Sequence, residues 1–152
     1  MTHLKVVAPS VLASLMLMTG CSSSSDTIGG AIADHTHGAG PNGGVVFGLG
    51  SQHAELTIDH GKKECMILVL GEDAITPTAV AATELVLNTR TTKTAEGTVV
   101  SPMTVMMKPA DVADGKASKF VGTDPGLGNI ADFTGMVSGE IDGKPSHGDF
   151  QE

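Results

Sequence analysis

The segment Met136-Val-Ser-Gly-Glu-Ile-Asp-Gly-Lys-Pro-Ser-His-Gly-Asp-Phe150 carries the strongest fold signal in this chain. It contains two short segments with apolar residues, 136–141 and 144–150, on either side of Asp142-Gly143. A two-residue Asp-Gly turn matches the right-handed twist of the strands that it joins. The stretch therefore predicts a β-hairpin at the end of the chain.

Similar short apolar segments recur from Val45 onward, separated by Gly, Pro, Asn and Asp at intervals of about ten residues, which is typical of all-β domains. The candidate strands are 45–49, 53–59, 64–70, 83–88, 99–108 and 118–121. Segment 53–59 alternates, which places Ala54, Leu56 and Ile58 on one face. The other face carries His53, Glu55, Thr57 and Asp59. Segment 64–70 does not alternate, which predicts burial on both faces.

Helical signals are nearly absent from the sequence. No stretch keeps helical periodicity over three turns, and only the segment that begins at Asp124 suggests a helical turn, with Asp124 as its cap and Pro125 in the first position. We therefore predict an all-β fold: an antiparallel β-sandwich of about seven short strands with at most one short helical turn.

The first twenty residues have the layout of a secretory signal peptide. Lys5 precedes an apolar stretch, residues 6–18, that is too short for a membrane-spanning helix, which takes about 20 residues. Gly20 directly before Cys21 resembles the lipobox of bacterial lipoproteins, which implies that Cys21 carries lipid after cleavage. The alternative is an ordinary secretory signal followed by a chance cysteine.

These features predict three parts of the chain: a signal peptide (1–20), a lipidated tether rich in Ser, Gly and His (21–44), and the β-sandwich domain (45–152). The lipid would hold the domain in the cell envelope, on a membrane surface that faces the periplasm. Ser22 rather than Asp follows the cysteine, which resembles lipoproteins sorted to the outer membrane more than those of the inner membrane.

Composition limits the classes of ligand. The chain has 17 acidic and 9 basic residues, and removal of Lys5 with the signal peptide takes the net charge from −8 to −9. This negative charge disfavours nucleic acids and favours cations as partners. Cys65 lies in an apolar run and is left without a partner if Cys21 is acylated, so we expect it to be a small buried hydrophobe.

Asp34-His-Thr-His-Gly-Ala-Gly-Pro-Asn-Gly-Gly44 contains the clearest candidate for a metal site. In an extended backbone, His35 and His37 point the same way, and imidazole suits Zn, Cu and Ni. Further ligands could come from His53, Glu55, His60 or Asp34, with His147 a more distant candidate. The alternative interpretation is a glycine-rich linker with no ligand.

Three motifs, His35-Thr-His-Gly38, Pro41-Asn-Gly-Gly44 and His53-Ala-Glu-Leu56, resemble a pattern in small bacterial envelope lipoproteins of unassigned function. A similar segment occurs near the start of periplasmic adaptor subunits of heavy-metal efflux pumps. The later motifs that share the resemblance are 83–88, 116–120, 139–144 and Gly148. The resemblance implies a single domain that handles metal. The chain departs from the pattern at Ala39-Gly40 and at Asn42, where a further histidine is frequent.

The sequence offers little for catalysis. It lacks a Gly-x-Ser-x-Gly elbow and a phosphate-binding loop, and the methionines of Met103-Thr-Val-Met-Met107 fit core packing better than copper(I) binding. We therefore expect a non-enzymatic module that binds a Zn- or Cu-type ion through His35, His37 and His53, and that buffers the ion or passes it to an efflux system. The alternative is a structural or protein-interaction lipoprotein with no role in metal binding.

Overall fold

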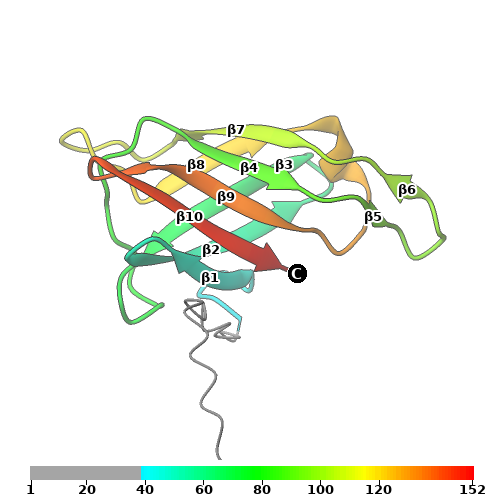
Figure 1. Cartoon of the computed structure of the whole chain (residues 1–152), viewed down its shortest axis with the longest axis horizontal. Coiled ribbons are helices and arrows are strands. Elements are labelled where there is room, and N and C mark those ends of the chain that lie inside the picture. The colour runs from blue at the N-terminus through cyan, green and yellow to red at the C-terminus, as the bar shows by residue number, and fades with distance from the viewer. Residues whose placement is uncertain (1–38) are drawn as a thin grey trace, which may run out of the picture. The chain divides into compact units, whose positions relative to one another are not determined.

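This computed structural model describes residues 39–152, which contain ten strands and one 3-10 turn joined by loops (Figure 1). The elements are β1 (Val45–Leu49), β2 (Gln52–Asp59), β3 (Glu64–Leu70), β4 (Leu85–Thr89), β5 (Thr92–Lys93), β6 (Val99–Val100), β7 (Thr104–Pro109), β8 (Lys119–Thr123), η1 (Pro125–Gly128), β9 (Thr134–Ile141) and β10 (Lys144–Gln151). The predicted all-β class is confirmed.

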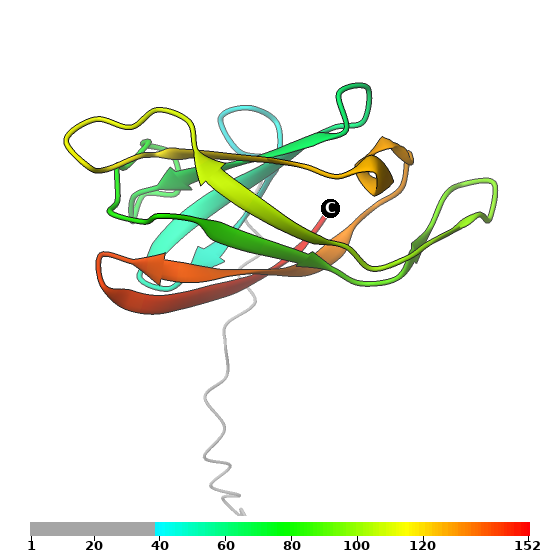
Figure 2. The same ribbon diagram turned by 90° about the horizontal axis from the view of Figure 1, so that it is seen from above.

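Eight strands form one antiparallel sheet in the order β1-β2-β3-β8-β7-β4-β9-β10, and β5 pairs with β6 in a separate ribbon. The sheet curls so that its two halves face each other, as Figure 2 shows. The halves are joined through β8 and β7, which share only two residue pairs, Lys108 with Val121 and Pro109 with Phe120. The predicted sandwich is thus a single, mostly closed sheet with two facing layers.

The sheet closes where β1 comes beside β10. The amide of Gly50 donates to the carbonyl oxygen of His147 at 3.3 Å, and the rings of Phe47 and Phe150 lie 6.0 Å apart. A Cβ atom built on Gly148 would lie 1.8 Å from the carbonyl oxygen of Gly48. The two strands therefore approach this closely only because position 148 has no side chain.

The core lies between the two halves of the sheet and is mainly aliphatic. Ala54 and Leu56 of β2 are fully buried in it, as the alternation of this strand predicts. The predicted burial of β3 on both faces is also confirmed: Ile67 packs in the main core, whereas Leu68 and Leu70 belong to a second buried cluster with Val46.

The two strongest turn predictions are confirmed. Asp142 and Gly143 between β9 and β10 have φ angles of 50° and 76°, the left-handed conformation that a two-residue hairpin turn requires. The 3-10 turn η1 is capped by Asp124, whose Oδ1 accepts a hydrogen bond from the amide of Gly126 at 2.7 Å, and Pro125 occupies its first turn.

One strand prediction is wrong in its extent. Residues 99–108 were predicted as one strand, but the structure divides them into β6 and β7. Pro102 lies in the break and has no amide hydrogen to donate to a ladder. Met103 then bonds Thr89 instead: its amide donates to Thr89 Oγ1 at 2.8 Å, and its carbonyl accepts from the Thr89 amide at 2.9 Å.

The predicted signal peptide and the first part of the predicted tether, residues 1–38, lie outside the described residues. Residues 39–44, predicted as part of the tether, pack on the sheet: Ala39 forms a β-bridge with Val45, and the amide of Gly40 donates to the Gly44 carbonyl at 2.9 Å. Over residues 39–152 there is no helix with the length and apolar character needed to span a bilayer.

The closure of the sheet predicts that two neighbouring alanine substitutions differ in their effect on stability. We expect Gly148→Ala to lower the free energy of unfolding by about 3 kcal/mol, because the new methyl group would collide with backbone rather than with a movable side chain. Gly48→Ala is the matched control, since a Cβ there has no atom within 4 Å. Denaturant unfolding measures both, and equal stabilities for the two variants would contradict this account of the closure.

Candidate functional site

His53 has an orientation that suits a metal ligand. It lies on the outer face of β2, opposite Gly48 on β1 and Leu70 on β3, and its ring is half-buried. Its Nδ1 lies 3.1 Å from the carbonyl oxygen of Gly71. Because a carbonyl only accepts, the proton of the neutral ring is on Nδ1 and the lone pair is on Nε2. Metal-binding histidines commonly have their second nitrogen fixed by a carbonyl in this way.

Glu55, two residues further along the same face, is fully buried and serves a different purpose. Its Oε1 accepts hydrogen bonds from the amides of Asn42 and Gly44, both at 2.8 Å, and its Oε2 accepts from Asn42 Nδ2 at 2.8 Å. We call this arrangement of Glu55, Asn42 and Gly44 the Glu55 clasp. Since the carboxylate is occupied by these donors, we do not assign Glu55 as a metal ligand.

Glycines allow the segment 39–44 to lie flat on β2. A Cβ atom on Gly40 would be 2.5 Å from Glu55 Cδ, and one on Gly44 would be 2.1 Å from the carbonyl oxygen of Leu56. Gly43 has φ of +81°, and its amide donates to the Gly40 carbonyl at 2.9 Å. The Gly-x-x-Gly-Gly spacing therefore has a structural cause, which the sequence analysis did not identify.

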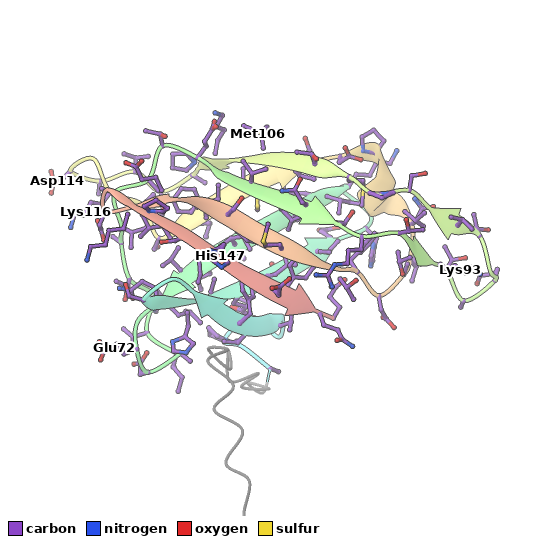
Figure 3. All side chains as sticks on the ribbon, in the orientation of Figure 1. Glu72, Lys93, Met106, Asp114, Lys116 and His147 are labelled. Atoms are coloured by element: carbon purple, nitrogen blue, oxygen red, sulfur yellow. The ribbon has the colours of Figure 1, made fainter. Side chains whose placement is uncertain are left out.

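The other predicted metal ligands are not brought together within the described residues. His35 and His37 lie outside the described part of the chain. His60 follows the opposite end of β2 from His53, seven residues away, a separation of about 23 Å at strand spacing. His147 is exposed on β10 (Figure 3). From residue 39 to residue 152, no group of three His, Cys, Asp or Glu side chains is placed to hold one ion.

His60 instead borders a shallow cavity of about 320 Å³ beside the β5–β6 ribbon. Its Nδ1 donates to the Leu127 carbonyl at 2.8 Å, and its ring lies 6.3 Å from that of Phe133. Other lining residues are Lys93, which Figure 3 labels, Ile130, Asp132 and Glu152. Burial raises the pKa of Glu152, although a hydrogen bond from the Phe133 amide opposes this effect. The lining therefore combines charged side chains of both signs with apolar ones.

The sulfur-containing side chains belong mainly to the core. Val105 and Met107 point inward and are buried, so the prediction of core packing is confirmed for this face of β7, whereas Met106 is exposed on the other face. Cys65 is buried, and its Sγ lies 3.6 Å from the Gly122 carbonyl oxygen. Burial raises the pKa of the Cys65 thiol to about 12. A buried thiol with a raised pKa holds little thiolate at neutral pH, and the thiolate is the form that acts as nucleophile or metal ligand.

The burial of Cys65 predicts that it resists alkylation in the native protein. In a chain that begins at Ser22, Cys65 is the only cysteine. At pH 8 we expect iodoacetamide to modify it about a thousandfold more slowly in native buffer than in denaturant, because the raised pKa suppresses the thiolate and the core blocks access. Mass spectrometry measures both rates. Rapid native labelling would show that the thiol is accessible.

Comparison of the chain with known protein families, with curated proteins and with solved structures found no match. The function of this chain is therefore inferred from the residues described above. Two of these features lie side by side on the outer face of β2. They are His53, whose Nδ1 lies against the Gly71 carbonyl, and Glu55, which holds the clasp.

Proposed function

We propose that this protein is an exported lipoprotein, lipidated on Cys21, whose β-domain binds a zinc- or copper-type ion without catalysing a reaction. The signal-like segment 1–20 and the polar segment that follows Cys21 support the anchor. The lipid would hold the domain at a membrane facing the periplasm, and Ser22 favours the outer membrane over the inner one. Two or three acyl chains would make this attachment effectively permanent.

The proposed ligands are His35, His37 and His53, and the observation that carries the proposal is the position of the Glu55 clasp. The clasp holds residues 42 and 44 against the strand that bears His53. His37 precedes Ala39 by two residues and His35 by four, so an extended chain keeps their Cα atoms within about 7 Å and 14 Å of Ala39. The proposed ligand set depends on this short connection between the two histidines and Ala39.

The chemistry of the ligands favours a borderline transition metal. Imidazole nitrogens suit Zn and Cu, and three of them leave a fourth position for water or for Asp34. The net negative charge of the protein attracts cations. We infer that the module buffers the ion in the envelope or transfers it to a heavy-metal efflux system.

A second candidate function is protein interaction, and exposed apolar side chains beside the His60 cavity favour it. Ile130 is 76% exposed and lines the cavity, and Val99, 59% exposed, pairs across the β5–β6 ribbon with Lys93, another lining residue. In this alternative the histidines have no role in metal binding. A partner captured equally well with and without a chelator would favour it.

The metal proposal predicts an affinity that depends on three imidazoles. Titration calorimetry of the chain from Ser22 onward with zinc and with copper should show one site. We expect His35→Ala/His37→Ala, and separately His53→Ala, to weaken binding at least about tenfold. Affinity should also fall as the pH drops below about 6, because protonated imidazole does not bind metal.

The control for this experiment is His60→Ala, which removes an imidazole about 23 Å from His53 along β2 and should leave the affinity unchanged. If the double variant binds as tightly as the unmodified protein, the proposed ligand set is wrong.

The anchor proposal predicts that Cys21→Ser moves the protein from the membrane fraction to the soluble fraction of cells, because the substituted side chain cannot accept the lipid. Cys65→Ala should remain in the membrane fraction, since Cys65 lies in the core. Fractionation followed by immunoblotting measures the distribution, and membrane retention of the Cys21 variant would refute lipid anchoring at this residue.

A further inference from the structure

The Glu55 clasp holds an Asn-Gly pair, the dipeptide in which an asparagine side chain is chemically least protected. In Asn42-Gly43, glycine has no side chain to shield its backbone nitrogen from the preceding amide. When that nitrogen attacks the side-chain carbonyl carbon of the asparagine, a five-membered succinimide ring forms. The bond from Cγ to Nδ2 breaks, and the nitrogen leaves as ammonia with the proton of the glycine amide. Water then opens the ring to give aspartate or isoaspartate.

The folded structure opposes this attack at both reacting groups. Asn42 Nδ2 donates to Glu55 Oε2 at 2.8 Å, and the Asn42 amide donates to Oε1 at 2.8 Å, so the side chain is held toward β2. The Gly43 amide, which would be the nucleophile, donates to the Gly40 carbonyl at 2.9 Å. The reaction therefore requires the segment 39–44 to leave the clasp first.

The geometry points to Asn42 as a deamidation site that Glu55 guards, and whose conversion to a carboxylate releases the segment 39–44 from the sheet. The release follows from charge. In the clasp, Asn42 Nδ2 is a donor to a fully buried carboxylate. Deamidation replaces this donor by an oxygen that carries negative charge, at hydrogen-bond distance from Glu55. Two carboxylates at this distance cannot both remain ionised, and the buried one cannot be solvated without opening.

The product therefore does not fit the clasp, and the chemical change makes the release irreversible. If a function of the residues before Ala39 requires segment 39–44 to be bound to β2, the release of this segment would end that function. The inference rests on residues 40–44 and on Glu55, and it holds whether or not the protein binds metal.

The first experiment measures deamidation at each asparagine during incubation at mildly alkaline pH, by peptide mass spectrometry. Asn88 and Asn129 are internal controls, because Thr89 and Ile130 follow them and branched side chains hinder ring formation. We expect Glu55→Gln to accelerate the reaction at Asn42 about tenfold, since a neutral hydrogen bond replaces a charge-assisted one. Glu140→Gln, an exposed glutamate on β9, is the matched control and should have no effect.

An acceleration confined to Asn42 supports the inference. An unchanged or slower rate at Asn42 in Glu55→Gln would overturn it, because Glu55 would then not protect the site. An equal rise at all three asparagines would also overturn it, because the effect would reflect general unfolding.

The second experiment tests the release itself by hydrogen exchange. We expect Asn42→Asp to remove the protection of the backbone amides at positions 42 and 44, while the amides of β3 and β9 stay protected. Asn42→Asp/Glu55→Gln should restore the protection, because the glutamine amide donates to the new carboxylate and its oxygen still accepts from the two backbone amides. Full protection in Asn42→Asp alone would contradict the proposed release.

Discussion

The close approach of β1 and β10 is the constraint on which the architecture depends. An eight-stranded sheet has two edges with unpaired backbone groups, and here the edges face each other across the Gly48 and Gly148 backbones. Because of this approach, the sheet closes around one core, which is filled by Val, Leu, Ile, Met and four phenylalanines. The two candidate sites are independent because His53 lies near the start of β2 whereas His60 follows its other end.

The outer face of β2 is the second organising feature. Glu55 lies opposite Val46 and Leu68, both apolar and both buried, so the sheet is covered here rather than exposed to water. Burial of a charged carboxylate is costly unless donors surround it, and two backbone amides with one side-chain amide meet that requirement. Segment 39–44 therefore belongs to the fold, and Glu55, which holds it, lies two residues from His53 on β2.

Local sequence signals predicted those parts of the fold that depend on neighbouring residues. The Asp142-Gly143 turn, the capped turn at Asp124 and the two buried faces of β3 were all evident, because each reflects backbone preference or hydrophobic patterning over a few residues. The break at Pro102 could have been found from the missing amide. The clasp could not have been predicted, since it joins Glu55 to residues more than ten positions away. The alternation of β2 also looks the same in the sequence whether a glutamate on its outer face is exposed to water or covered by another segment.

The position of the clasp also has a mechanical consequence. A load applied to the chain from its N-terminal side passes through the bridge of Ala39 with Val45 and then through the hydrogen bonds of Glu55 before it reaches β1. These contacts are separate from those between β1 and β10 at Gly48 and Gly148, which come later along the chain. Segment 39–44 can therefore leave β2 without opening the sheet. If the chain is anchored through its N-terminal side as proposed, tension on the anchor would therefore load segment 39–44 before it loads the contact of β1 with β10.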